Sequence, residues 1–153
     1  MKIELGKLDH PLVIELLEEH IKDMRSISPP ESKHALDLVG LSADDISFWT
    51  IWNEHGEVMG CGALKALDDK HAEIKSMRTS LKFRSQGVAA FMLEHLISEA
   101  KMKGFECIQL ETGAMDFFKP AHRLYAKYGF EQCGPFANYR EDPLSLFMLL
   151  NLN

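Results

Sequence analysis

The chain has 153 residues, 46% of them hydrophobic and 26% charged, which fits one globular domain over residues 1–153. Its formal net charge of −6 argues against binding to nucleic-acid phosphates and is compatible with a cationic acceptor. The N-terminus has no apolar signal region and no long apolar run follows, so we expect neither secretion nor membrane insertion; three scattered cysteines fit reduced thiols in the cytoplasm.

Apolar periodicity predicts the elements of the first half. We expect a strand at 2–5 and an amphipathic helix that begins at Pro11 and ends before Ser28. A second short helix is expected to begin near Ser32 and to be closed by Gly40. Strands at 48–52 and 58–64 flank a hairpin turn at 53–56, and a third strand at 71–79 is expected to pair beside them.

The second half alternates helices and strands. A helix after Gly87 is expected to end at Lys103-Gly104, and a strand follows at 107–112. The next helix has Pro120 in its first turn and a glycine stop at Gly129, and residues 144–150 form a last strand. This order predicts an α/β fold with a mixed sheet.

The junction at 84–89, Arg-Ser-Gln-Gly-Val-Ala, lies where a strand leads into a helix. The first backbone N–H groups of a helix lack partners and lie at the positive end of its dipole, which suits a phosphate or a diphosphate. Glycine at 87 lets a ligand approach the main chain without a Cβ in the way. The same turn taken alone is also compatible with a purely structural role.

Three segments together resemble the GNAT superfamily of acetyl-CoA-dependent N-acetyltransferases, over roughly residues 71–134, and most resemble a small, poorly assigned bacterial subgroup. The loop at 84–89 matches the family pattern R/Q-x-x-G-x-G/A, and Leu-Tyr-Ala-Lys-Tyr-Gly-Phe at 124–130 matches L-Y-x-x-x-G-F. Glu73 precedes Gly87 by fourteen residues, where some members have a general-base glutamate. The resemblance implies a mostly antiparallel sheet flanked by helices and splayed between its two central strands.

The resemblance also implies acetyl-CoA as co-substrate and direct attack of a primary amine on the thioester. Tyr125 is the implied acid for the leaving thiolate, Glu73 is the implied base, and Glu111 is a rival base. The thioester oxygen is expected to meet a backbone N–H near Met77. The implied cofactor contacts come from the third strand, the loop and the segment before the last helix: Met77, Arg78, Thr79, Arg84, Ser85, Gln86, Gly87, Val88, Ala89 and Phe118.

Each catalytic assignment has a structural alternative. Tyr125 fits a core aromatic, and Glu73 fits an exposed carboxylate paired with Lys75 on the same face of a strand. Phe118 stands where many family members have an asparagine that helps to hold the cofactor, which leaves the contacts of that segment open. His122, one helical turn before Tyr125, could orient the tyrosine or line the adenine side, but we expect it to be solvated.

The acceptor site is expected between the first two helices, where family members differ. Its candidate residues are Arg25, Glu31, Ser32, His34 and Glu111, with Arg25 placed to clamp a carboxylate; the alternative is a solvent loop with a helix cap at Ser32. Phe136 and Tyr139 could wall the acceptor pocket or form the seam of a homodimer. A small amine or an amino acid fits the compact chain, whereas a protein N-terminus or lysine stays open.

A GNAT-fold module that binds acyl-CoA without turnover is the alternative from another functional class. The sequence does not contain the pattern G-x-x-x-x-G-K-[ST] of nucleotide hydrolases. The glycine pair in Gly60-Cys61-Gly62 lies inside an expected strand and not before a helix, so we do not expect nucleotide hydrolysis. His71, Glu73 and His122 lack metal-ligand spacing, so we expect no metal.

Overall fold

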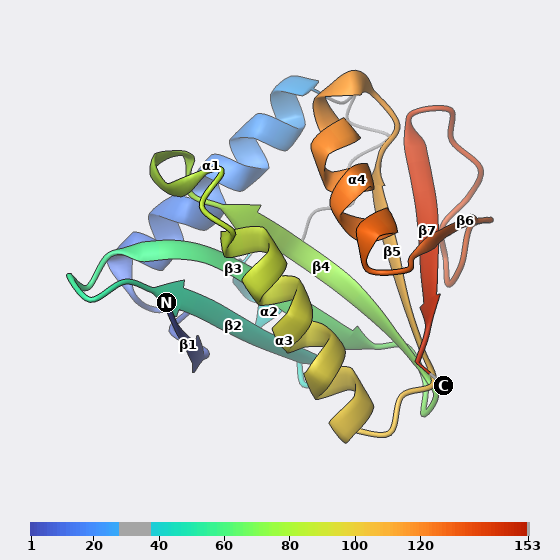
Figure 1. The fold of residues 1–153 in the computed structure, drawn as a ribbon, viewed down its shortest axis with the longest axis horizontal. Coiled ribbons are helices and arrows are strands. Elements are labelled where there is room, and N and C mark those ends of the chain that lie inside the picture. The colour runs from blue at the N-terminus through green and yellow to red at the C-terminus, as the bar shows by residue number, and fades with distance from the viewer. Residues whose placement is uncertain (28–37, 153) are drawn as a thin grey trace.

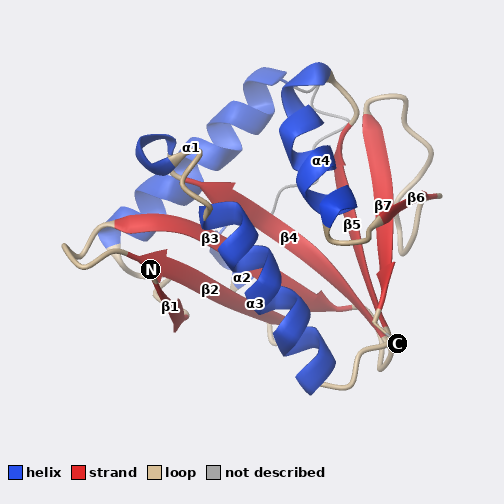
Figure 2. Ribbon diagram, viewed as in Figure 1, coloured by secondary structure: helices blue, strands red, loops and turns tan. Residues whose placement is uncertain are grey.

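A computed structural model describes residues 1–27 and 38–152, with the backbone alone at 24–27. The described residues form a seven-stranded sheet in the order β1-β2-β3-β4-β5-β7-β6 (Figures 1 and 2). Its strands are β1 (Lys2–Leu5), β2 (Ile46–Trp52), β3 (Val58–Ala66), β4 (His71–Thr79), β5 (Cys107–Gly113), β6 (Glu131–Cys133) and β7 (Ser145–Asn151). The helices are α1 (Pro11–Ile27), α2 (Leu38–Leu41), α3 (Val88–Met102) and α4 (Lys119–Lys127), with 3-10 turns at Leu81–Phe83 and Asp116–Phe118.

The predicted elements match those observed, with two exceptions. The prediction that Gly40 closes the second helix is wrong, because α2 runs through Gly40 to Leu41. Leu41 is 2% exposed and packs in the core under α1, so burial of this leucine favours continuing the helical turn. The expected start of that helix near Ser32 lies outside the described residues. The sequence did not predict β6, whose three residues are too few to show alternation.

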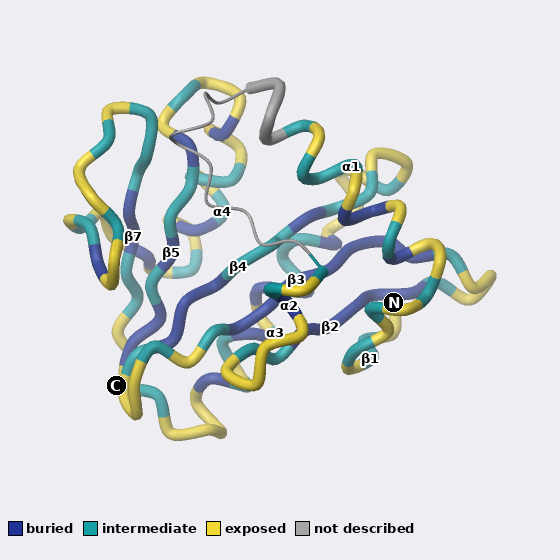
Figure 3. The backbone as a smooth tube through the Cα atoms, turned by 180° about the vertical axis from the view of Figure 1, so that it is seen from behind, coloured by how far each residue is buried: buried dark blue, intermediate teal, exposed yellow. Residues whose placement is uncertain are grey.

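The sheet separates two hydrophobic cores. Residues of α3 and α4, among them Leu93, Leu96 and Tyr125, pack on one face, and Leu16, Leu17 and Leu41 from α1 and α2 pack on the other. The central strands are correspondingly buried, whereas turns and helix outer surfaces are exposed (Figure 3). Within the described residues no helix is both long and apolar enough to cross a membrane.

The sheet opens between its two central strands, as predicted. Strand β4 pairs with β5 in parallel, from His71 opposite Cys107 to Ile74 opposite Leu110, and there the pairing stops. Beyond that point the two strands fan apart, and α4 lies over the opening (Figure 1). A bulge shifts the register of β4 against β3 between Cys61 and Ala63, and Ser76 on β4 has a φ of 54°. A bulge leaves its extra residue out of the ladder, and the Ser76 carbonyl here accepts from Cys61 Sγ at 3.2 Å.

Candidate active site

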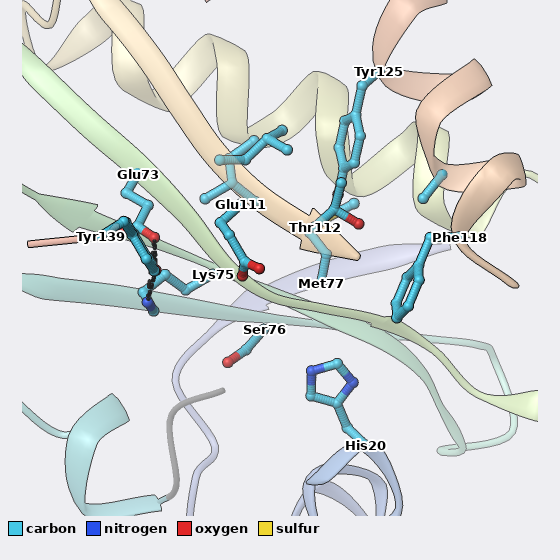
Figure 4. Close-up of a pocket in the computed structure, with 13 residues that line it drawn as sticks. His20, Glu73, Lys75, Ser76, Met77, Glu111, Thr112, Phe118, Tyr125 and Tyr139 are labelled. Atoms are coloured by element: carbon cyan, nitrogen blue, oxygen red, sulfur yellow. Dashed lines mark hydrogen bonds and ion pairs between the residues drawn. The ribbon is translucent and has the colours of Figure 1, made fainter. Parts of the chain in front are cut away.

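Two adjoining cavities lie where β4 and β5 separate. The larger, of about 530 Å³, extends from the end of β4 to the beginning of α3 and along α4. The smaller, of about 140 Å³, lies between β4, β5 and the segment that contains Tyr139 (Figure 4). The residues that line both cavities are His20, Met77, Phe118, Ala121 and Tyr125. These five residues therefore form the boundary that the two cavities share.

The loop before α3 has the conformation of an anion site. Ser85 and Gly87 both adopt left-handed backbone angles, with φ of 62° and 82°. The first α3 N–H with a helical partner is that of Phe91, which bonds to the Gly87 carbonyl at 3.0 Å, and no side chain caps the helix. The preceding N–H groups of α3 are thus unpaired within the helix and oriented as in a backbone nest, which fits a diphosphate.

Most of the loop residues predicted to hold the cofactor line the larger cavity. These residues are Arg84, Ser85, Gly87, Val88 and Ala89, together with Met77, Arg78 and Thr79 of β4. Gln86 is exposed and is not among the residues that line it. A Cβ built on Gly87 would meet no atom within 4 Å, so the protein itself requires glycine there for its backbone angle rather than for space.

Tyr125 packs in the core and also borders the candidate site. Its side chain is 7% exposed and packs against Phe130 at 5.6 Å between ring centroids, as a core aromatic does. It also lines both cavities. Burial raises the pKa of the Tyr125 phenol to about 12, so the hydroxyl keeps its proton at neutral pH.

Phe118 is fixed in place by the strand beneath it. A Cβ at Gly113 would lie 2.1 Å from Cε2 of Phe118, so only glycine allows this ring to lie against β5. The half-buried His122 bonds through Nε2 to the Gly113 carbonyl at 2.7 Å. The expectation of a solvated His122 is therefore wrong, because its ring ties α4 to β5.

A buried ion pair with a phenol forms one wall of the smaller cavity. Lys75 Nζ lies 3.2 Å from Glu73 Oε2, and both side chains are less than a tenth exposed. Tyr139 donates to the same Glu73 oxygen at 2.5 Å and accepts from Lys75 Nζ at 2.8 Å. The alternative that Glu73 is an exposed carboxylate is wrong, although its predicted pairing with Lys75 is confirmed. Tyr139 is among the residues that line this cavity, which is compatible with its predicted place in the wall of the acceptor pocket.

Glu111 supplies a second carboxylate to the smaller cavity. It extends from β5, beyond the last residue paired with β4, and accepts a hydrogen bond of 2.8 Å from the Ser145 hydroxyl. Figure 4 shows Glu73 and Glu111 on the two diverging strands, with Tyr125 and Phe118 approaching from the α4 side. The separation of the strands therefore brings both candidate bases to the same cavity.

The other acceptor candidates lie outside what is described: Glu31, Ser32 and His34 entirely, and Arg25 through its side chain. Sequence reasoning missed two residues of α1 at the site, His20 and Asp23. Burial lowers the pKa of His20 to about 4, with Arg78 lowering it further and Asp23 opposing, so the imidazole is neutral at pH 7. Their spacing on α1, three residues apart, is a signal that could have placed both on one helix face.

The sequence profile described as Acetyltransferase (GNAT) family matches residues 13–130 of this chain. This chain belongs to the GNAT family. The Bacillus subtilis (strain 168) protein named Uncharacterized N-acetyltransferase YsnE is 49% identical over 152 residues, covering 99% of this chain and 100% of that protein. The IAA acetyltransferase of Azospirillum brasilense is 38% identical over 138 residues, covering 89% of this chain and 88% of its own.

The fold agrees with solved GNAT structures. The crystal structure of a GNAT family acetyltransferase from Elizabethkingia anophelis with acetyl-CoA bound has a TM-score of 0.67 and 21% identity, covering 98% of this chain and 97% of that one. The predicted GNAT-type sheet, splayed between its central strands, is thereby confirmed. The family match, the relatives and the shared fold together identify this GNAT protein as an acetyltransferase. They favour an enzyme over a module that only binds acyl-CoA.

Proposed function

We propose that this GNAT acetyltransferase transfers the acetyl group of acetyl-CoA to a primary amine of a small molecule by direct attack. The observation that carries the proposal is the position of Tyr125, which lines both the cavity beside the loop before α3 and the cavity with Glu73 and Glu111. Tyr125 would thus act as the proton donor for the leaving thiolate from a position between the cofactor and the base. The acetyl-CoA in the Elizabethkingia neighbour supports this co-substrate.

The larger cavity would hold coenzyme A. The unpaired N–H groups at the beginning of α3 would bind the diphosphate, and Arg84 would add a charge-assisted contact. Main-chain groups of β4 from Met77 to Thr79 would hold the pantetheine arm as an added strand does. Phe118 and Tyr125 would then close around the thioester end, because both line the junction with the smaller cavity.

The chemistry needs a base, an oxyanion donor and an acid. Glu73 would take the proton of the acceptor amine directly or through water, with Glu111 as the alternative base. The neutral amine nitrogen would bond to the thioester carbon, and a backbone N–H near the β4 bulge at Met77 would stabilise the oxygen that gains charge. As the carbon–sulfur bond breaks, Tyr125 would give its proton to the leaving thiolate.

A small acceptor is favoured by the size of the smaller cavity, about 140 Å³. The volume suits a compact amine more than a folded protein surface. Glu73, Lys75 and Glu111 also contribute two carboxylates and one ammonium, and this excess of negative charge attracts a cationic amine.

The test combines calorimetry with a turnover assay. Acetyl-CoA is titrated into the purified protein, and thiol release is then followed with a panel of small amines. We expect binding heat and amine-dependent thiol release, with Glu73→Gln and Glu111→Gln compared at saturating acetyl-CoA to identify the base. The variant of the true base should lose about 10²- to 10⁴-fold in turnover. An absence of heat at millimolar acetyl-CoA would overturn the proposal.

A further inference from the structure

Arg78 is a buried cation on the α1 side of the sheet. Its partner residue across the ladder is Cys61 of β3, which belongs to the core under α1. The Arg78 side chain is 6% exposed, and its Nη1 lies 2.7 Å from Oδ2 of Asp23 on α1. Its side chain therefore points away from the α3 face, on which Val88 and Met92 pack.

Asp23 engages only one nitrogen of Arg78. The other two, Nε and Nη2, are buried and have no hydrogen-bond partner among the described residues. These two nitrogens form one edge of the planar guanidinium, whose parallel N–H groups match the two oxygens of a carboxylate. Leaving such donors unpaired in the interior is unfavourable, and Arg78 is among the residues that line the larger cavity, so a ligand oxyanion that reached this edge would satisfy both donors.

The smaller cavity has the opposite charge balance. Glu73 and Glu111 outnumber Lys75 there, whereas Arg78 and Arg84 outnumber Asp23 in the larger cavity. His20 lines both cavities and is neutral at pH 7, because burial lowers its pKa to about 4, so it adds no charge between them. An acceptor with an amine at one end and a carboxylate at the other matches this arrangement, with its amine in the smaller cavity and its carboxylate beside Arg78.

We propose that the Nε–Nη2 edge of Arg78 binds a carboxylate of the acceptor, and that the acceptor is an amino acid. This inference rests on the proposed function, whose acceptor it narrows from primary amines to amino carboxylates. Asp23 orients the guanidinium through its contact with Nη1. The amine of the acceptor then points toward Glu73 and Glu111. The main chain of Arg78 stays available to the pantetheine arm, because only its side chain turns toward α1.

The coenzyme A diphosphate is the other oxyanion within reach of this cavity. It is assigned to the loop before α3, where Arg84 and the N–H groups of the helix already provide its contacts. The face on which Arg78 lies favours the acceptor over the diphosphate. Measuring whether the affinity for the acceptor or the affinity for CoA depends on Arg78 distinguishes the two possible ligands of its side chain.

The experiment titrates the common α-amino acids and their primary amides into the protein, with and without saturating CoA, which lacks the acetyl group and cannot react. We expect at least one acid to bind about 10- to 100-fold more tightly than its amide. Arg78→Met should remove this difference and leave CoA affinity within about twofold. Arg78→Lys keeps the positive charge but loses the two parallel N–H donors, so it should keep only part of the affinity difference between the acid and its amide. Thermal melting checks that both variants fold.

Two results would overturn the assignment: acids that bind no better than their amides, including no binding of either, or an Arg78→Met variant that loses CoA affinity instead. The titrations without CoA measure the preference for a carboxylate by itself. A wild-type protein that binds no CoA but prefers acids would count against the proposed function and for the role of Arg78. The reverse pattern would count against Arg78 alone.

Discussion

The phenol of Tyr139 donates a hydrogen bond of 2.5 Å to Glu73, across 66 residues of chain. Burial and the neighbouring Glu73 charge raise the pKa of Tyr139 well above its usual range, so the phenol remains a donor at every pH of interest. Lys75 completes the group by donating to both partners. One wall of the smaller cavity is thus held by three mutually bonded polar groups, and its shape depends on all three.

Lys75→Met should strongly destabilise the protein, because it leaves the buried Glu73 carboxylate with Tyr139 as its remaining described donor. Removing one partner of a buried ion pair reduces the free energy of unfolding by about 3–5 kcal/mol. Urea unfolding at pH 7 measures this loss.

The double variant Glu73→Gln/Lys75→Met is the matched control. It removes both charges, while the amide oxygen of the introduced glutamine can still accept from Tyr139, so it should recover most of the lost stability. A single Lys75→Met protein as stable as the double variant would show that the ion pair does not determine the stability of this wall.

Tyr125→Phe should lower turnover and leave the KM for acetyl-CoA nearly unchanged. The substitution keeps the ring that packs against Phe130 and removes only the proton donor. The loss expected for a general acid is about 10²- to 10⁴-fold in kcat. Since the pKa of Tyr125 is about 12, its ionisation should not produce an alkaline fall in activity below pH 10. Unchanged kcat would contradict the role of acid, and thermal melting verifies that the core is intact.

The sequence predicted the parts of this site that depend on local backbone geometry. The glycine before α3, the tyrosine on α4 and the glutamate on β4 belong to elements whose periodicity or caps can be read locally. The family resemblance then assigned them roles. The side chains of Glu73 and Tyr125 lie beside the predicted opening of the sheet, because the parallel pairing of β4 and β5 ends at Ile74 and Leu110.

The parts that the sequence did not predict depend on contacts between distant segments. Tyr139 lies in an irregular segment after β6, and its bond to Glu73 leaves no periodic signal. The pairing of Arg78 with Asp23 requires the crossing of α1 over β4, and the bulge at Ser76 changes which β4 side chains face α1. A strict alternation along β4 cannot place Lys75 and Arg78 on the same face, whereas the bulge does.

His20 should make stability depend on pH. Burial lowers its folded-state pKa to about 4 from an ordinary 6.5, with a further lowering by Arg78. The unfolded chain therefore binds the proton more tightly, and the stabilisation present above pH 6.5 is lost as pH falls toward 4. This loss should be about 2–3 kcal/mol for the wild type. Urea unfolding of His20→Gln at pH 7 and pH 4.5 should show a smaller difference than the wild type; equal differences would contradict the burial of a neutral imidazole.

Gly87→Ala should weaken both the fold and acetyl-CoA binding, and Gly104→Ala separates the two effects. Both glycines have left-handed angles, with φ of 82° and 86°, and an added Cβ at either would meet no atom within 4 Å. They lie at opposite ends of α3, and Gly87 alone lines the larger cavity. Each alanine should therefore cost about 1–2 kcal/mol of unfolding free energy through backbone strain alone.

Acetyl-CoA affinity should respond to one of these substitutions only. At Gly87 the strain moves the N–H groups proposed to bind the diphosphate, and an exposed Cβ enters the space that the diphosphate would occupy, so calorimetry should show a loss of about tenfold or more. Gly104→Ala should bind acetyl-CoA as the wild type does, because its strain lies a full helix away. Equal affinities for the two variants would place the diphosphate elsewhere, since the strain is matched and only the distance from the cavity differs.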